Sequence, residues 1–475
     1  MAGAGVAGTP NPAASLLAVV GDCASATTGA AFPGVTSVAM NEITTVAAAY
    51  ALAGFATDSL HIGAPSAVKG HALSRTGLAN AFTIALNLAN QVSGVPNATL
   101  PLNSNAVVPV TTINTLADIL AACINSNGVS SSGCSTLFAN TTYGTAPTDT
   151  ATAAINIAQH PGANVSALLN LATNASPFQP ITSVNDFFLG INYTGGGLNN
   201  PQGIAIDGAG NAWVAESSGN SVIEFSSAGK VLSGAAGYTG GGLNGPLAIS
   251  IDSSNNVWVA NSSAASVTKF SSSGAVLSGT SGYTGGGVRF PQGIAIDGSG
   301  NAWVIGYFSD GLDEFSSTGA VLFGSGGLNV PGGIAIDASG NAWIPNGGRN
   351  AVTEFSNAGA ILSGTGYTGG GLSQPLDVAI DGAGNVWLAN NSSDSVTVLS
   401  NTGAALSGTG GYTSGGLIFP LWIAVDGSGN VWATNYQGNS VTELIGVGAP
   451  VITSIAAGLP VIPTLNGSSK LGTRP

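Results

Sequence analysis

The stretch Pro201-Gln-Gly-Ile-Ala-Ile-Asp207-Gly-Ala-Gly-Asn211-Ala-Trp213 occurs six times in this chain with small changes. Its copies are spaced by 45, 45, 40, 44 and 45 residues and begin at Pro201, Pro246, Pro291, Pro331, Pro375 and Pro420. In every copy an aspartate stands six residues after the proline, an asparagine ten and a tryptophan twelve. A fixed period of this length indicates an array of small, similar units that must stack to bury their apolar faces.

Each repeat predicts four short antiparallel strands. In the first copy they cover residues 203–207, 212–216, 222–225 and 230–233, and the turns between them are rich in Gly, Asn and Ser. Six such units are typical of a β-propeller, in which closing the ring protects the sheet edges. We therefore expect a six-bladed β-propeller of four-stranded blades.

A propeller also needs a segment that completes its last blade. Residues 186–192 lead into Tyr193-Thr-Gly-Gly-Gly, which matches the end of a repeat at Tyr238 and Tyr283. We predict that residues 186–192 supply the fourth strand of the last blade. The competing segment is 446–452.

The chain before the repeats has a helical pattern. Leu116, Ile119, Leu120 and Cys123 recur at the spacing of one helix face. We expect an irregular bundle of five or six helices. The fold class is therefore multidomain, α followed by all-β. An Ala-rich helical domain covers 1–180, the propeller 181–447 and a C-terminal tail 448–475.

The composition excludes some partners. The net charge is −13, and the repeats hold only four basic residues: Lys230, Lys269, Arg289 and Arg349. Because nucleic-acid binding needs clustered Lys and Arg, we expect no nucleic-acid partner. The chain has no run of about 20 apolar residues, so we expect no membrane insertion either.

The first residues, Met1-Ala-Gly-Ala-Gly, lack the basic and apolar segments of a signal peptide. Either the protein is cytosolic or its natural start lies elsewhere. We favour the second alternative and expect an extracellular or cell-envelope protein.

The chain has three cysteines. Cys123 and Cys134 flank a short Ser/Gly/Asn-rich loop, and we predict a disulfide between them; the alternative is two reduced cysteines on helices. Cys23 is left over. It is either buried as a small apolar residue or paired outside this sequence.

The pattern Pro-x-Gly-Ile-Ala-x-Asp-x-x-Gly-Asn-x-Trp-Val resembles the NHL repeat and equally the repeat of virginiamycin B (streptogramin) lyases. The resemblance covers residues 186–445 and implies a β-propeller. It implies no single activity, since such propellers serve as enzymes, RNA binders, sensor domains and adhesion modules. The helical part is similar to segments that precede such repeats in exported bacterial proteins.

The resemblance to the lyases implies a histidine acid/base and a magnesium ion, but the sequence has no histidine after His160. We therefore expect no catalytic residue, metal or cofactor, and an enzyme only as the alternative: a lyase- or lactonase-like protein with non-histidine groups. The glutamates available for that role are Glu216, Glu224, Glu314, Glu354 and Glu443.

Two recurring features have a structural interpretation. The six turn aspartates are expected to bond their own backbone, and the six tryptophans to pack between neighbouring blades. His61, His71 and His160 share no metal-ligand spacing, so we expect surface or capping roles.

The repeats differ from one another on one loop face, which joins the second and third strands and links successive blades. Its candidate ligand-binding residues are Arg289, Phe290, Tyr307, Phe308, Arg349, Asp377, Phe419, Trp422 and Tyr436. Aromatic and arginine residues on one loop face are typical of a binding patch, whereas neutral drift in loops is the alternative. We expect a non-catalytic scaffold that binds a glycan, peptide or protein there.

Overall fold

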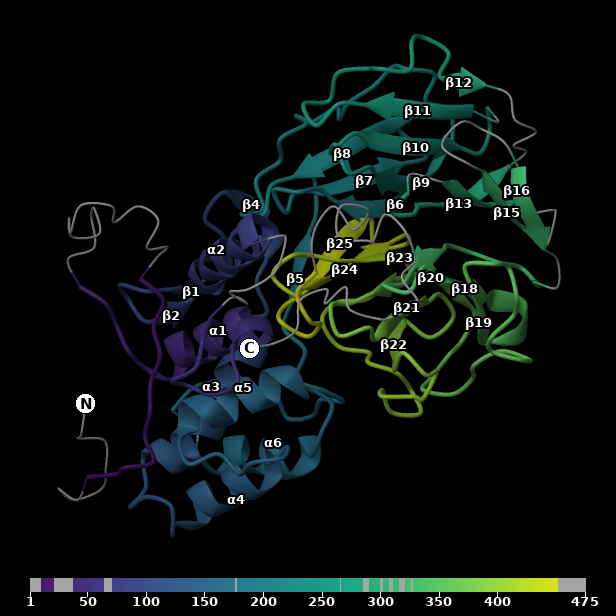
Figure 1. Ribbon diagram of the computed structural model, residues 1–475. Helices are drawn as coiled ribbons and strands as arrows, with labels where there is room; N and C mark the ends of the chain where they lie inside the picture. Colours follow the sequence, from purple (N-terminus) through teal and green to yellow (C-terminus); the bar gives the residue numbers. More distant parts are fainter. Residues whose placement is uncertain are drawn as a thin grey trace.

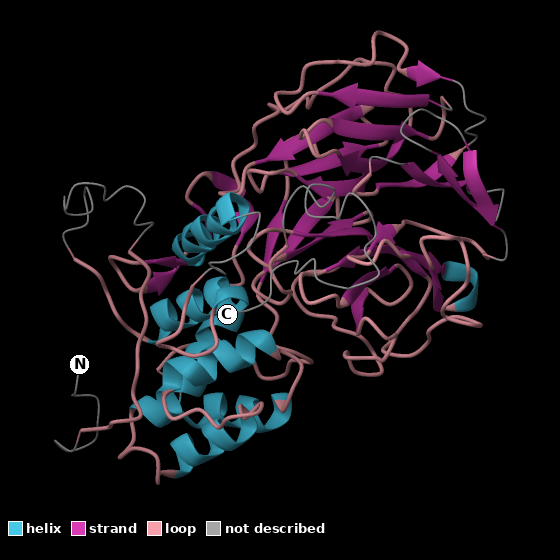
Figure 2. Cartoon of the chain, in the orientation of Figure 1, coloured by secondary structure: helices cyan, strands magenta, loops and turns pink. Residues whose placement is uncertain are grey.

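The computed structural model has a helical part followed by β-sheets (Figures 1 and 2). It describes residues 10–20, 37–63, 71–175, 177–264, 266–284, 290–299, 302–306, 311–315, 321–325 and 328–451. No helix within these residues is long and apolar enough to span a membrane. The domain boundaries expected at 180 and 447 stay predictions.

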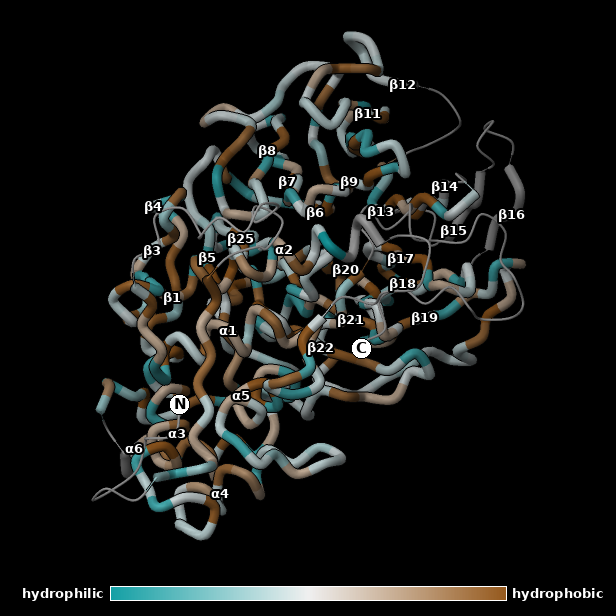
Figure 3. The backbone as a smooth tube through the Cα atoms, turned by 60° about the vertical axis from the view of Figure 1, so that its left-hand side comes forward, coloured by the Kyte–Doolittle hydropathy of each residue, from teal (hydrophilic) through white to brown (hydrophobic). Residues whose placement is uncertain are grey.

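Six α-helices form the first part within the described residues, as expected, and 3-10 turns occur at Ala53–Phe55 and Gly347–Arg349. The helices are α1 (Glu42–Leu52), α2 (His71–Leu88), α3 (Val110–Ile124), α4 (Ser132–Asn140), α5 (Thr150–Gln159) and α6 (Val165–Ala175). Helix α1 begins at a capping box, in which Asn41 accepts from the backbone N–H of Thr44 and the Thr44 hydroxyl accepts from that of Asn41. Its small side chains are buried against α2, α3 and α5, and its path is largely hydrophobic in Figure 3.

The predicted disulfide is present. It joins Cys123 in α3 to Cys134 in α4, with Cα atoms 4.3 Å apart. The third cysteine, Cys23, lies outside the described residues.

The repeats form six antiparallel sheets, which we call repeat sheets one to six. The first two are β6 (Pro201–Ile206), β7 (Ala212–Glu216), β8 (Ser221–Phe225), then β9 (Pro246–Ile251), β10 (Val257–Asn261), β11 (Ser266–Phe270), β12 (Tyr283–Thr284). The next two are β13 (Pro291–Ile296), β14 (Ala302–Gly306), β15 (Gly311–Phe315), β16 (Val321–Ser325), then β17 (Ala335–Ile336), β18 (Ala342–Asn346), β19 (Ala351–Phe355). Repeat sheet five is β20 (Pro375–Ile380), β21 (Val386–Asn390), β22 (Ser395–Leu399). Repeat sheet six begins with β23 (Pro420–Val425), β24 (Val431–Asn435), β25 (Ser440–Leu444).

The first strands of the repeat sheets contact one another in sequence order: β6 with β9, β9 with β13, β13 with β17, β17 with β20, and β20 with β23. Strand β23 in turn contacts β6, so the last repeat sheet lies beside the first.

Repeat sheet six is completed by a strand from before the repeats. Strand β5 (Gly190–Tyr193) pairs with β25, placing Ile191 opposite Glu443. Residues 186–192 were predicted for this place, and the end of that segment takes it. The competing residues 446–451 form no strand in the structure.

The helical part also contributes to this sheet. A hairpin of β3 (Thr99–Leu100) and β4 (Asn103–Val107) continues it beyond β5, and a separate hairpin pairs β1 (Ala89–Asn90) with β2 (Val95–Pro96). The helical pattern of the sequence did not predict these strands.

The expected fourth strand differs in most repeat sheets. In sheet one, residues 230–233 form only a bridge from Val231 to Phe225, and Tyr238 makes a second bridge to Val222. The chain leaves the ladder at Ser233, whose hydroxyl accepts the Glu224 N–H in place of a backbone carbonyl. Bridges at Tyr367 and Tyr412 replace the fourth strand in sheets four and five.

Candidate functional site

The recurring turn aspartates are saturated by local hydrogen bonds. Oδ1 of Asp207 accepts the backbone N–H groups of Ala209 and Asn211, and Oδ2 accepts the side chains of Asn211 and Trp213. The same four bonds occur at Asp252, Asp337, Asp381 and Asp426. These carboxylates therefore hold the turn, as predicted, and no group of three or more His, Cys, Asp or Glu in the described residues could hold a metal ion.

The third-strand glutamates join the same networks. Glu224 accepts from Asn211 and from the Tyr238 hydroxyl, at 3.0 and 2.7 Å. In repeat sheet two the equivalent residue is Lys269, whose Nζ lies 3.2 Å from Asp252 and 4.1 Å from the ring centre of Trp258. In these repeat sheets the position links the third strand to the first turn.

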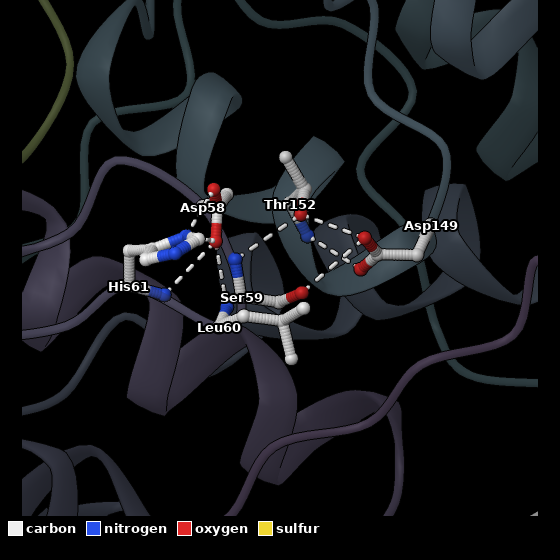
Figure 4. A network of polar contacts seen from close by, with 6 residues as sticks. All are labelled: Asp58, Ser59, Leu60, His61, Asp149 and Thr152. Carbon is white, nitrogen blue, oxygen red and sulfur yellow. Dashed lines mark hydrogen bonds and ion pairs between the residues drawn. The ribbon is translucent and has the colours of Figure 1, made fainter.

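The structure describes the side chains of two of the three histidines, His61 and His160, and the side chain of His71 lies outside that part. His61 is exposed and its Nδ1 lies 2.7 Å from Asp58, whose pKa is lowered chiefly by this hydrogen bond (Figure 4). The Ser59 hydroxyl instead donates to Asp149, the N-cap of α5, so serine, histidine and aspartate do not form a triad here. His160 is the C-cap of α5, in agreement with the expected capping role.

A cavity of about 120 Å³ lies between the first strands of the six repeat sheets. We call the end near the prolines, where these strands begin, the loop end, and the end near the aspartate turns the turn end. Asp377 and Trp422, two residues after their prolines, line the loop end. Val451 lines the turn end.

The turn end is covered by other parts of the chain. The backbone N–H of Ala449 donates to the Asp381 carboxylate, and that of Gly448 to the Gly429 carbonyl. Helix α2 lies against the same turns, where its Gly77 carbonyl accepts from the Ser428 hydroxyl. In the described residues, this end of the cavity is therefore covered by α2 and by residues 448–451.

Two buried carboxyls lie toward the loop end. Burial raises the pKa of Asp377 to about 8, although the N–H groups of Ile423 and Val378 donate to this carboxyl. Burial also raises the pKa of Glu216 to about 8, against the effect of a hydrogen bond from the Asn199 N–H. Both acids are thus largely protonated near neutral pH.

Glu216 stands where four other repeats have asparagine: Asn261, Asn346, Asn390 and Asn435. Those asparagines donate to a hydroxyl of the third strand, as Asn261 does to Thr268. Glu216 cannot donate when ionised, and its Oε1 has no hydrogen-bond partner in the described structure.

The structure places the predicted ligand-binding residues that it describes at different depths. Asp377 and Trp422 are only 6% and 9% exposed and lie inside, whereas Phe290 is 52% exposed. The rings of Phe419 and Tyr436 lie 6.1 Å apart, and both side chains pack against the buried cluster that includes Trp422.

Of the remaining candidates, the structure describes one and leaves three undescribed. Arg349 is exposed on its 3-10 turn, and Arg289, Tyr307 and Phe308 lie outside the described residues. Sequence reasoning missed Gln202, which is buried and whose Oε1 accepts from the Trp422 indole at 3.4 Å. The sequence offers little reason to select Gln202, because Gln292 occupies the same position in the third repeat.

No family model and no curated protein matches the chain. Solved structures that resemble it include a streptogramin B lyase, at 14% identity and TM-score 0.40, covering 52% of this chain and 94% of that one. A virginiamycin B lyase from Staphylococcus aureus matches at 17% identity and TM-score 0.41, covering 54% and 84%. A gluconolactonase from Xanthomonas campestris matches at 15% identity and TM-score 0.44, covering 54% and 89%. All three likenesses have TM-scores below 0.5 and carry no conclusion about the activity of this chain.

Proposed function

We propose that the protein is an exported six-bladed β-propeller that binds a ligand or partner through its loop end without catalysing a reaction. The blade count is supported by the cycle of contacts among the first strands, which includes β23 with β6. We propose that the partner is a glycan, a peptide or a protein.

Hydrogen bonds between neighbouring repeat sheets at the loop end also support a closed ring. In each of these contacts, which we call clamps, a side chain of one repeat accepts a backbone N–H of the next. In repeat sheet one, the Asn220 side chain accepts the N–H of Gly245, just before the proline of the next sheet, at 2.8 Å. Asn350 and Asp394 make the same contact to Gln374 and Phe419. Asn439 of sheet six accepts the Asn200 N–H of sheet one at 2.9 Å, so the same clamp joins the last repeat to the first.

The observation that favours binding is the contrast between the two ends. The turn end is uniform in sequence and covered by α2 and residues 446–451. The loop end is where the repeats differ, and it combines exposed Phe290 and Arg349 with the cavity residues Asp377 and Trp422. Rigid scaffolds commonly present variable loops for recognition.

The test is a pull-down on insoluble cell-wall glycans and on an immobilised peptide library. We expect Phe290→Ala and Arg349→Ala each to weaken retention several-fold. Matched controls are the exposed Leu277→Ala and Lys230→Ala, which lie on the third-to-fourth strand segments away from the loop end. Equal retention of all four variants would contradict a binding site at the loop end.

A second candidate is a lyase- or lactonase-like enzyme with non-histidine groups. It is favoured by Asp377, since a carboxyl protonated near neutral pH can act as a general acid. Against it, no other side chain that lines the cavity is titratable. Turnover of a sugar lactone or a streptogramin B by the purified chain, lost in Asp377→Asn, would support the enzyme over the scaffold.

Export is the third element of the proposal. It is supported by the Cys123–Cys134 disulfide, because such bonds persist in oxidising compartments. Fusion of the natural gene start to a periplasmic reporter tests it, and a reporter retained in the cytosol would contradict it.

A further inference from the structure

We propose that the central cavity binds a small primary alkylammonium ion, with the Asp377 carboxylate as its counter-ion. This site rests on the proposed binding function, because a ligand enters through the loop end. It adds the chemical class of one ligand, an organic cation with a short apolar tail.

The charge of the cavity favours a cation. Asp377 is the one titratable residue among its lining residues, and none of them is Lys, Arg or His. One oxygen of its carboxyl accepts the Ile423 N–H at 2.8 Å. A buried carboxylate is costly without a partner of opposite charge, and a bound ammonium supplies that partner.

The backbone supplies further acceptors. Each first strand is hydrogen-bonded along one edge to its second strand, as β20 is to β21, and stands at the end of its sheet. On the other edge of β20, near Asp377, the Leu376 carbonyl accepts the Gly333 N–H at 2.6 Å, and a carbonyl oxygen keeps a second lone pair as an acceptor. An ammonium group has three N–H donors and can bond Asp377 and such carbonyls together.

Trp422 completes the recognition of the charge. It lines the same end of the cavity as Asp377, and the residue after it, Ile423, donates to that carboxylate. Indole rings attract cations through their π-face. The chain already uses this contact elsewhere, where the Lys269 Nζ lies 4.1 Å from the ring centre of Trp258.

The walls define the tail of the ligand. Ile204, Ile249, Ile294 and Ile334 line the cavity, which suits a hydrocarbon chain. The volume of about 120 Å³ fits a chain of about four carbons, since a cavity of about 150 Å³ holds benzene. A divalent metal ion fits less well, because a single carboxyl leaves most of its coordination to neutral groups.

Binding of the cation changes the protonation of the Asp377 carboxyl. Burial raises the pKa of Asp377 to about 8, so near neutral pH the carboxyl of the empty cavity holds its proton. When the cation binds, the carboxyl ionises and releases one proton to the buffer. Binding should therefore tighten as pH rises toward 8.

The experiment is calorimetric titration of the full chain with n-butylammonium near pH 7, in two buffers of different ionisation enthalpy. We expect one site and release of about one proton per bound ion. Asp377→Asn should weaken binding by about 30-fold, the cost of removing one partner of a buried charge pair. The control Asp58→Asn alters an aspartate of the helical part, outside the cavity, and should bind like the unchanged protein.

Three results would overturn the proposal: no binding of n-butylammonium, equally tight binding of n-butanol, or displacement of n-butylammonium by Mg²⁺ or Ca²⁺ at similar concentration. If Asp377→Asn does not fold, the buffer dependence and the n-butanol comparison on the unchanged chain still decide. The glycan and peptide pull-down with Phe290→Ala is independent of the cavity, so failure of this site would be distinguished from failure of the binding function.

Discussion

Single residues of the repeat hold the turns and the packing between sheets. In repeat sheet five, Oδ2 of Asp381 accepts from the indole of Trp387 at 3.1 Å and from the N–H of Ala449. Because Trp387 is buried, removing its acceptor leaves an indole N–H without a partner. The aspartate therefore stabilises the sheet through the tryptophan.

Asp381→Ala should lower the free energy of unfolding by about 2–3 kcal/mol, because several buried donors lose their acceptor. Urea denaturation measures the change. Asp58→Ala, a half-exposed aspartate of the helical part, is the control and should change it by less than about 0.5 kcal/mol. Equal effects of the two variants would exclude a special role of the turn network.

Glu216 predicts a pH dependence. Its folded pKa of about 8 lies above the value of about 4.3 in unfolded chains. Its contribution to stability is therefore complete below about pH 4 and is lost as pH rises to about 8. Glu216→Gln does not titrate and can donate to Ser221, so it should exceed the unchanged protein by about 1–3 kcal/mol near pH 8 and by less near pH 4. Parallel stability curves from urea titrations at both pH values would contradict this.

The sequence predicted the roles of these residues unevenly. Repetition identified the turn aspartates and tryptophans as structural, because one position recurs in six units. Asp377 and Trp422 stood out as departures from the repeat, but their depth did not follow from the pattern. How deeply a side chain is buried depends on how closely the first strands of neighbouring repeat sheets approach each other. At Asp377 the approach is close, because its Oδ1 lies against the backbone of Gly333.

At the scale of elements, the first three strands of each repeat followed from alternation and turn residues. The fourth strand formed as expected in repeat sheet three, as β16, but not in sheet one, where its ladder bonds are taken over by a serine hydroxyl and a glycine-rich turn at Ser233 and Gly234. The β3–β4 hairpin was missed because its partner, β5, lies far along the chain.

The contribution of strand β5 to stability can be tested at a single hydroxyl group. The Tyr193 hydroxyl donates to Glu443 at 2.6 Å, as Tyr238 does to Glu224 within repeat sheet one. Tyr193→Phe should lower the free energy of unfolding by about 1–3 kcal/mol, since Glu443 is fully buried. Tyr238→Phe is the matched control and should cost less, because Tyr238 is only partly buried. The reverse order in chemical denaturation would argue against β5 as an integral strand.

At the scale of the whole molecule, the helical part and the repeats share one sheet of β23, β24, β25, β5, β4 and β3. The Tyr50 hydroxyl of α1 also donates to the Phe187 carbonyl at 2.8 Å. Calorimetric unfolding should therefore show one transition for the two parts. Two separate transitions would mean that they are independent domains.

The central claim is that a strand from before the repeats completes repeat sheet six, and a cysteine pair tests it most directly. Asn192 and Thr442 are directly opposed on β5 and β25. In a Cys23→Ser background, Asn192→Cys with Thr442→Cys should form a disulfide that peptide mass mapping detects. Asn192→Cys with Thr397→Cys, at the equivalent position of repeat sheet five, should not. A folded protein that leaves the first pair reduced under oxidising conditions, or links the second pair instead, would contradict the pairing of β5 with β25.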